Sequence, residues 1–110
     1  MNDKFCVLPF IHFELNTNGE YRPCCLYDIP NNEKVYDIHS SSLSDIRNGD
    51  WLKDIQSRML DGSGSSGCYK CYNDDTLGNT SRRFRENQRF SDEIENINNG
   101  VYNLRIVDLK

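Results

Sequence analysis

The residues most able to do chemistry in this 110-residue chain are its five cysteines. Cys68 and Cys71 form a Cys-x-x-Cys pair, which can bind one metal ion or one cluster from a tight turn. Cys6 and Cys24 lie at the two ends of a predicted β-hairpin, so the hairpin presents two thiols at one place. Four thiolates from three separate segments can enclose something larger than a single ion. We therefore expect a metal centre at Cys6, Cys24, Cys68 and Cys71, with an iron–sulfur cluster favoured over zinc.

Other interpretations of the same residues stay open. A structural Cys₄ zinc site would use the same four ligands, although zinc ribbons usually supply both pairs from knuckle-like turns. His12 or His39 could complete a Cys₃His site. Cys25 points to the opposite face of the strand from Cys24, so we expect it outside the ligand set. Free cysteines can also be small buried hydrophobic residues with no ligand role.

The composition limits the class of protein and the compartment. The formal net charge is -4, which argues against a general nucleic-acid binder. The chain contains no apolar run of membrane-spanning length, and its first residues lack a signal-peptide pattern. We expect a cytoplasmic protein, with no membrane or nucleic-acid partner, whose thiols stay reduced. An odd number of cysteines in that compartment favours metal or redox chemistry over a disulfide framework.

The hairpin is predicted from alternating residues and a turn signal. Residues 11–15 alternate with the period of a half-buried strand. Asn18-Gly19 provides the central residues of a type I′ turn, and residues 20–24 return as the second strand. Pro23 cannot donate to the ladder, so the second strand ends there or lies at an edge.

Helices are predicted in the second half of the chain. Residues 26–41 are expected to be mostly loop, with a short strand near Val35–Ile38. Ser42 and Asp45 signal the start of a short helix that ends at Asn48-Gly49. A second helix follows Asp50 and ends at Asp61-Gly62, and residues 80–98 form helix interrupted near Phe90-Ser91. In the second helix an apolar stripe is predicted to pack against the hairpin; its residues are Leu52, Ile55, Met59 and Leu60.

These elements predict a small α+β domain with an N-terminal hairpin and two or three helices packed on one side. The Gly- and Ser-rich residues 62–67 predict a flexible stretch. Leu104–Leu109 has the apolar character of a strand inside a parallel sheet, which would normally be followed by a crossover helix. We therefore expect one metal-binding domain over residues 1–98, and a linker with the first strand of a missing barrel domain over residues 99–110.

The cysteine pattern and its surroundings resemble a known family. Cys6 to Cys24 has the form Cys-x12-Gly-x4-Cys, with Gly19 at the turn, and Cys68-Tyr69-Lys70-Cys71 follows. This pattern resembles the SPASM/twitch domain of radical S-adenosylmethionine (radical SAM) proteins, in its N-terminal twitch form. The resemblance extends over nearly the whole chain, including the segment from Phe5 to His12 and the helix that ends Met59-Leu60-Asp61-Gly62.

The resemblance implies an auxiliary [4Fe-4S] cluster held by Cys6, Cys24, Cys68 and Cys71. The chain has no cysteine after Cys71, so it is similar to the twitch form with one cluster and not to the two-cluster SPASM form. It also lacks the Cys-x3-Cys-x2-Cys motif of the radical-generating cluster, so we expect no catalysis by this chain alone. In the parent enzyme the module would serve electron transfer or substrate placement beside a radical SAM core, for a peptide or small-molecule substrate.

Two further hypotheses remain at this stage. The four cysteines could form a structural zinc module in a protein-interaction domain, where metal binding supplies folding free energy. The chain could also be a small interaction protein whose cysteines are incidental. The iron–sulfur and zinc hypotheses use the same four ligands and differ in the metal that the thiolates hold.

Overall fold

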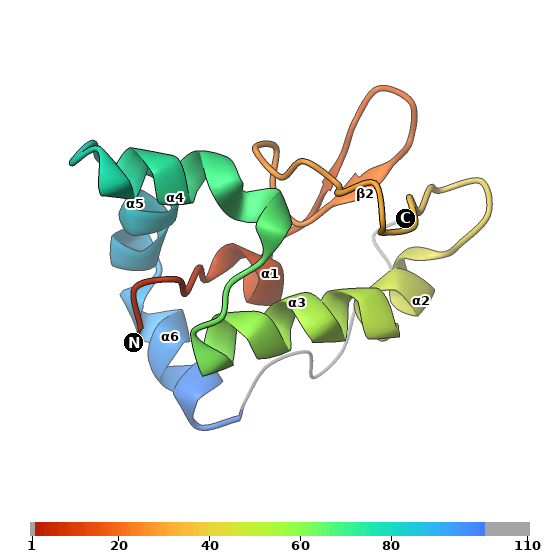
Figure 1. Ribbon diagram of the computed structural model, residues 1–110. Helices are drawn as coiled ribbons and strands as arrows, with labels where there is room; N and C mark the ends of the chain where they lie inside the picture. The colour runs from red at the N-terminus through yellow and green to blue at the C-terminus, as the bar shows by residue number, and fades with distance from the viewer. Residues whose placement is uncertain (1, 101–110) are drawn as a thin grey trace.

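The computed structural model describes residues 2–100, and these form an α+β domain in which helices predominate. The α+β class predicted from the sequence is confirmed. Figure 1 shows the two-stranded hairpin at one end, with α3 along one side and α4 to α6 gathered at the other end. The elements of the described part are α1 (Leu8–Ile11), β1 (Glu14–Leu15), β2 (Tyr21–Arg22), α2 (Leu43–Arg47), α3 (Asp50–Asp61), a 3₁₀ turn η1 (Ser66–Cys68), α4 (Tyr69–Thr76), α5 (Arg82–Arg89) and α6 (Ser91–Asn98).

The hairpin is shorter than predicted because its first residues are helical. Residues 8–11 form α1, with Pro9 in the first turn, where its fixed φ suits a helix and its missing N–H costs nothing. The Arg47 guanidinium donates to the carbonyls of Pro9 and Phe10, at 3.2 Å and 2.8 Å, so the free acceptors at the end of α1 are satisfied. The predicted strand over residues 11–15 is therefore reduced to Glu14–Leu15.

The hairpin loop also differs from the predicted type I′ turn. The Gly19 N–H donates to the Asn16 carbonyl at 3.0 Å, so Thr17 and Asn18 are the central residues of the turn, and Gly19 follows at φ +83°. The Asn16 side chain accepts from the N–H groups of Asn18 and Glu20, which fixes this three-residue loop. Leu15 pairs with Tyr21 and Glu14 with Arg22 across the ladder.

The segment after the hairpin returns to its edge. Glu20 and Asp37 form an isolated antiparallel bridge, and the Tyr21 N–H donates to the Tyr36 carbonyl at 2.8 Å. The short strand predicted near Val35–Ile38 is thus limited to one bridge. This contact still covers part of the hairpin edge.

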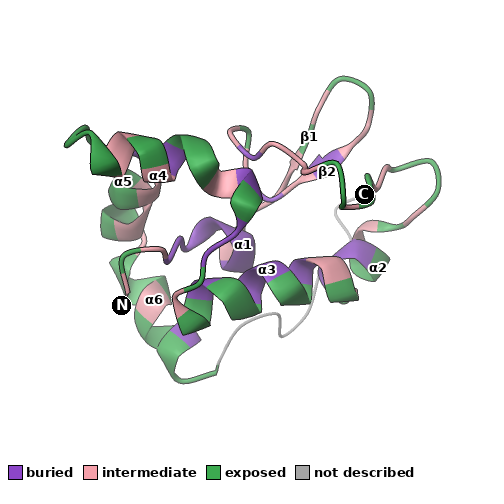
Figure 2. Cartoon of the chain, viewed as in Figure 1, coloured by how far each residue is buried: buried purple, intermediate pink, exposed green. Residues whose placement is uncertain are grey.

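The helices α2 and α3 begin and end where the sequence predicts. The Ser42 hydroxyl accepts from the Asp45 N–H at 3.1 Å, which is the expected N-cap of α2. Gly62 ends α3 in the left-handed conformation, at φ +85°. Figure 2 shows the buried face of α3 turned toward α1, so the apolar stripe packs on α1, whereas the sequence predicted packing on the hairpin. Leu52, Ile55 and Met59 are buried in this stripe, but Leu60 is exposed.

The Gly- and Ser-rich residues 62–67 are packed into the fold, contrary to the predicted flexible stretch. Ser65 is buried and its hydroxyl lies 3.0 Å from the Tyr27 hydroxyl. Gly67 is buried against the Tyr27 ring, where a Cβ atom would come within 2.3 Å of a ring carbon. Glycine at this position allows the chain to pass directly over the ring.

The helix predicted over residues 80–98 is present as α5 and α6, divided at Phe90. Ile94 and Ile97 of α6 pack against the core, whose centre is the N-terminal segment from Phe5 to Phe10. The strand predicted at Leu104–Leu109 lies outside the described residues.

Candidate metal centre

The four predicted cysteines line one cavity, although they come from three separate segments of the chain. The cavity lies between the N-terminal segment, the turn after β2, the start of α4 and the start of α5. Its wall is almost entirely apolar or sulfur-bearing apart from two arginines. The lining residues are Cys6, Leu8, Cys24, Leu26, Tyr27, Cys68, Cys71, Arg82 and Arg83.

Cys6 is placed by an extended segment that ends in α1. The Asn87 side chain of α5 forms hydrogen bonds with the two residues that flank Cys6. Its Nδ2 donates to the Phe5 carbonyl at 2.9 Å, and its Oδ1 accepts from the Val7 N–H at 2.8 Å. The Arg83 guanidinium donates to the same Phe5 carbonyl at 2.8 Å. These hydrogen bonds satisfy the backbone groups of Phe5 and Val7, as a neighbouring strand would. They hold Cys6 in place with only 8% of its surface exposed.

Cys24 is placed by the turn that follows β2. The Tyr27 N–H donates to the Cys24 carbonyl at 3.1 Å, which closes a turn over residues 24–27. Pro23, which is buried, ends the ladder just before it, as its missing N–H requires. The Arg22 side chain donates to the Tyr27 carbonyl at 2.9 Å and braces the same turn.

Cys68 and Cys71 lie at the start of a helix, where the sequence predicted only a tight turn. Cys68 is the N-cap residue of α4 and Cys71 is in its first turn, buried to 8% exposure. Their spacing of three residues places both side chains on neighbouring positions of the helix surface. The Tyr72 hydroxyl lies against Cys68 and donates to the Lys4 carbonyl at 3.0 Å, which links α4 to the N-terminus.

The cavity disfavours ionisation of three of its thiols, those of Cys6, Cys24 and Cys68. Burial raises the pKa of Cys6 to about 12, and burial likewise raises the pKa of Cys24 and of Cys68. For Cys68 the neighbouring thiols of Cys6, Cys24 and Cys71 raise the pKa further, because a second negative charge beside the first is unfavourable. The four sulfur atoms are therefore close enough to influence one another, and a bound cation would relieve both effects.

Backbone N–H groups and arginine charges lower the pKa of Cys6 and of Cys24, and so oppose the effect of burial. The Leu8 N–H lowers the pKa of Cys6 and the Leu26 N–H lowers that of Cys24, in each case by a hydrogen bond to sulfur. The positive charges of Arg83 and Arg82 act in the same direction on Cys6 and Cys24 respectively. Hydrogen-bond donors and cations around sulfur are suited to thiolates that bind a metal centre.

The remaining sequence candidates lie outside the cavity. Cys25 is exposed, and an Arg82 N–H donates to its Sγ. His12 Nε2 lies 2.9 Å from Glu14 Oε1, and His39 is exposed in the loop before α2. Within residues 2–100 no group of three or more His, Cys, Asp or Glu side chains is close enough together to hold a single metal ion.

Three tyrosines near the cysteine-bearing segments lie in different surroundings. Tyr72 contacts Cys68, whereas the Tyr69 hydroxyl donates to the exposed Asp28 at 2.7 Å. Tyr21 packs against Phe13 in the hairpin, with ring centroids 5.9 Å apart. The residues that sequence reasoning missed are Arg82 and Arg83. Their basic patch was visible in the sequence, but nothing in it distinguished these two arginines from Arg85 and Arg89.

No helix described in the structure is long and apolar enough to cross a bilayer.

Comparison with known proteins agrees with the cysteine pattern. The model of the SPASM family, described as an iron–sulfur cluster-binding domain, matches residues 6–72, which is more than half of the chain. The matched range contains all four cysteines of the cavity. Searches among curated proteins and among solved structures found no match. The chain therefore belongs to the SPASM family of iron–sulfur cluster-binding domains.

Proposed function

We propose that Cys6, Cys24, Cys68 and Cys71 together hold one [4Fe-4S] cluster. The observation that carries this proposal is the convergence of four cysteines, from three segments, on one apolar cavity. Four cysteine thiolates are the usual ligand set of such a cluster, and burial with hydrogen bonds to sulfur is the means by which proteins tune it. Family membership supports the same kind of cofactor.

The donor set and the charges of the site fit a cluster. Four thiolates would bring four negative charges into a buried place, and Arg82 and Arg83 on its wall would offset part of them. The cavity is narrow, at about 20 Å³, so the segments that bear the cysteines would have to move apart around the cluster. One backbone hydrogen bond joins the segment after the Cys24 turn to the 3₁₀ turn before α4: the Asp28 N–H donates to the Gly67 carbonyl at 3.0 Å.

The role of the module follows from what a buried cluster supplies. When bound, the cluster can accept and return one electron, and the protein's residues exclude water and set its potential. We propose that the chain is the auxiliary module of a radical SAM enzyme, where it serves electron transfer or substrate placement. Its partner would then be a radical SAM core in the same parent chain, joined through residues 99–110, and the substrate would be a peptide or small molecule.

The test is the visible absorption spectrum of the whole chain after anaerobic reconstitution with iron and sulfide. We expect the broad brown absorbance of a cluster in the wild-type protein. Cys68→Ala should lose most of it, because one of four ligands is missing. Cys25→Ala is the matched control, since Cys25 is exposed beside Cys24 and does not line the cavity.

Two outcomes would count against the proposal. Equal loss of absorbance in Cys25→Ala and Cys68→Ala would mean that the ligand set is assigned wrongly. A wild-type protein that stays colourless and binds zinc stoichiometrically would make the site a structural Cys₄ zinc centre instead.

A further inference from the structure

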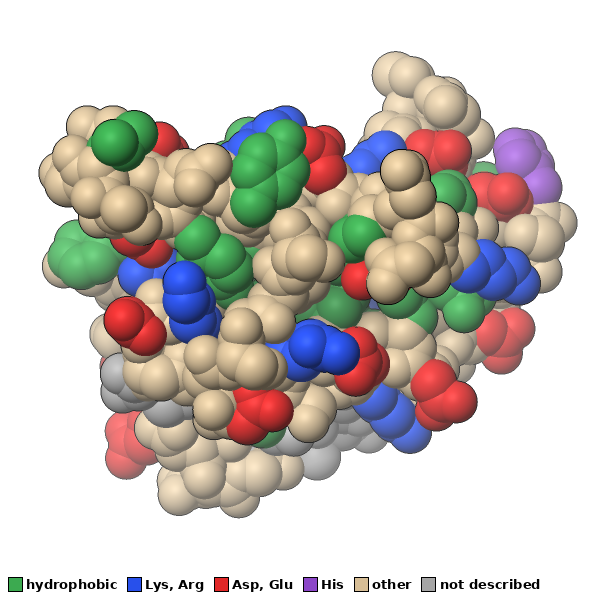
Figure 3. All heavy atoms as spheres, in the orientation of Figure 1, with side chains coloured by type: hydrophobic (Ala, Val, Ile, Leu, Met, Phe, Trp, Pro, Cys, Tyr) green, Lys and Arg blue, Asp and Glu red, His purple; other side chains and the backbone are tan. Residues whose placement is uncertain are grey.

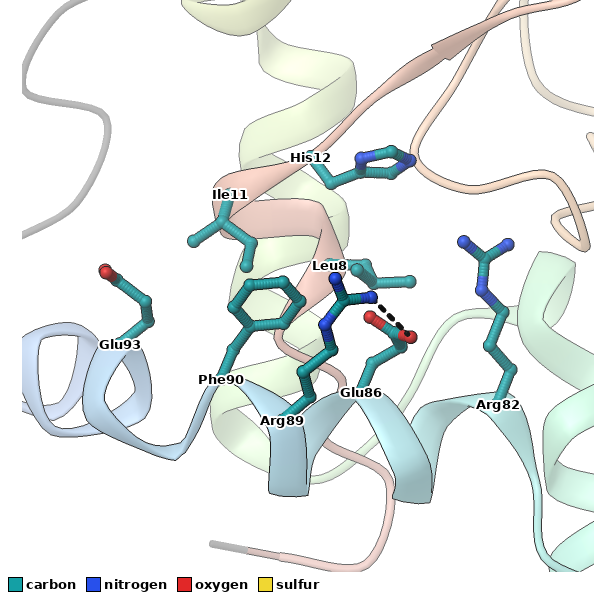
Figure 4. A pocket seen from close by; sticks show the side chains of 8 residues that line it. All are labelled: Leu8, Ile11, His12, Arg82, Glu86, Arg89, Phe90 and Glu93. Carbon is teal, nitrogen blue, oxygen red and sulfur yellow. Dashed lines mark ion pairs between the residues drawn. The ribbon is translucent and has the colours of Figure 1, made fainter.

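Arg82, like Leu8, lines both the cysteine cavity and a larger open pocket beside it. It lies at the start of α5, directly after the buried N-cap Ser81, whose hydroxyl accepts from the Phe84 N–H. Its side chain lines the cysteine cavity on one side. On the other side it lines an open pocket of about 650 Å³ between α1 and α5, which Figure 4 shows with Arg82 and His12 near one end and Glu93 near the other.

The two neighbouring arginines of the cavity wall are engaged in different ways. Arg83 forms hydrogen bonds with two other segments of the protein. Its Nε donates to the Asp75 carboxylate at 2.9 Å, and its guanidinium also donates to the Phe5 carbonyl. The Asp75 carboxylate neutralises its charge at close range. Arg83 therefore holds the fold together, and the Asp75 carboxylate compensates part of the charge that Arg83 brings to the cavity wall.

The contacts of Arg82 face the sulfur atoms. An N–H of its guanidinium donates to the Sγ of Cys25, the residue next to Cys24, and the same side chain lines the cavity that holds the Cys24 thiol. Its nearest carboxylate is Glu14, whose Oε1 lies 3.6 Å away and is shared with His12 at 2.9 Å. The side chain of Arg82 is only 22% exposed, so solvent screens its charge incompletely.

We propose that Arg82 sets the reduction potential of the cluster held by Cys24 and its three partner cysteines, and that Glu14 moderates this effect. The inference rests on the proposed function. It concerns the electrostatics of the site, whereas the ligand assignment depends on the cysteines alone. The sign of the effect follows from charge: a fixed cation beside the site favours the more negative state.

The redox step is a one-electron transfer. A low-potential one-electron reductant would give one electron to the cluster, and the total charge of cluster and four thiolates would change from −2 to −3. No proton or bond moves in this step. Arg82 stabilises the −3 state more than the −2 state, so it raises the midpoint potential, because net charge is one of the factors that set such potentials.

The test is a potentiometric titration of the reconstituted chain, with dithionite as reductant and mediator dyes. For Arg82→Gln we expect the equilibrium constant for reduction to fall on the order of tenfold, which is about 59 mV for a one-electron couple. Arg82→Lys keeps the charge and should restore most of the wild-type potential. Arg85→Gln is the matched control, because Arg85 is exposed on the same helix and donates to the Thr80 carbonyl.

Glu14→Gln is an independent variant that should shift the reduction potential in the opposite direction from Arg82→Gln. Removing the carboxylate leaves the charge of Arg82 less compensated, so the potential should rise. If Arg82→Gln does not take up a cluster, this variant decides the question. Unchanged potentials in both Arg82→Gln and Glu14→Gln would overturn the inference but leave the ligand assignment intact. A wild-type chain without a cluster would overturn both.

Discussion

At the scale of single residues, the site is a set of thiols whose surroundings are poorly suited to free thiolates. Cys6 and Cys71 are buried, and Cys24 and Cys68 are partly buried. Removing water from a thiolate without a partner is costly, so the metal-free site favours neutral thiols. The metal-free and metal-bound forms should therefore respond differently to pH.

The stability of the metal-free protein should fall at alkaline pH. Burial raises the pKa of Cys6 to about 12, above the unfolded thiol value of about 8.5. A raised pKa in the folded state stabilises the fold fully below the unfolded value, and this contribution is lost as the pH rises toward 12. Burial raises the pKa of Cys24, Cys68 and Tyr27 as well, so these groups act with the same sign.

Thermal unfolding between pH 7 and pH 11 checks this expectation. The Tm of the metal-free chain should fall across the range, and the Tm of the reconstituted chain should fall less, because its thiols are already deprotonated as ligands. A metal-free Tm that stays constant or rises between pH 9 and pH 11 would contradict the account.

Gly67→Ala should destabilise the protein by about 1–3 kcal/mol, as overpacking of a tight site does. The added Cβ would lie 2.3–2.6 Å from three atoms of the Tyr27 ring, and Tyr27 is itself buried and bonded to Ser65 and Glu33. Urea unfolding measures the loss. Ser66→Ala is the control, because Ser66 is the exposed neighbour; an equal loss in the two variants would show that the contact with the ring is unimportant.

At the scale of elements, α5 acts as a brace for the segment that carries Cys6. Asn87 makes two hydrogen bonds to this segment and Arg83 makes a third. The helix lies outside residues 6–72, the range matched by the family model. A helix outside the matched range thus fixes one of the proposed ligands.

Asn87→Ala should weaken this brace. Loss of the side chain leaves the Val7 N–H without its partner, which costs about 1–3 kcal/mol for a buried group. We expect a lower urea midpoint and faster loss of the reconstituted absorbance to a chelator. Gln88→Ala, at an exposed position of the same helix, should leave both unchanged. Identical chelation rates in the wild type and Asn87→Ala would show that α5 does not position Cys6.

Local signals in the sequence were sufficient to predict some elements and not others. The cap at Ser42 and the glycine end at Gly62 predicted α2 and α3, because each depends on a contact within a few residues. The helix α1 was not predicted, and its last residue, Ile11, was assigned to the strand, because the end of the helix is stabilised by Arg47, which is distant in sequence. The helix α4 (Tyr69–Thr76), whose N-cap residue is Cys68, was missed because the Gly- and Ser-rich residues before it suggested a loop.

The candidate site was likewise predicted in part: its cysteines were predicted from the sequence, and the other residues of its wall were not. The four cysteines could be chosen from their spacing, and the structure brings them to one cavity. The cavity wall could not be predicted, because Arg82, Arg83 and Tyr27 reach it through the tertiary packing of α5 and of the turn after β2. The residues that tune a metal centre are chosen by proximity in space, which spacing along the chain does not reveal.

At the scale of the whole molecule, the proposed metal site and the hydrophobic core are continuous. Cys6 is a member of the core cluster with Phe5, Val7 and Tyr27, and Cys24 and Cys68 pack against it. On the face that Figure 3 draws, acidic and basic side chains are interspersed, with hydrophobic side chains in small separate groups. With a mean hydropathy of -0.75 the chain has little apolar material for a larger core, so a bound cluster should contribute to stability.

Removing the cluster should therefore lower the stability of the whole domain. Ligand binding to the folded state alone raises its stability, and the proposed ligands join the N-terminal segment to α4. We expect the reconstituted chain to unfold at a higher urea concentration than the chelated chain, in one cooperative transition. Equal midpoints would mean that the cluster is bound without support from the core.

The most direct test of the central claim is the iron and acid-labile sulfide content of the anaerobically reconstituted chain. The account predicts about four iron and four sulfide per chain, as one [4Fe-4S] cluster requires. Each alanine variant of Cys6, Cys24, Cys68 and Cys71 should lower both contents, and Cys25→Ala should keep the wild-type values. Stoichiometric zinc with no sulfide, or an iron content that none of these four variants lowers, would contradict it.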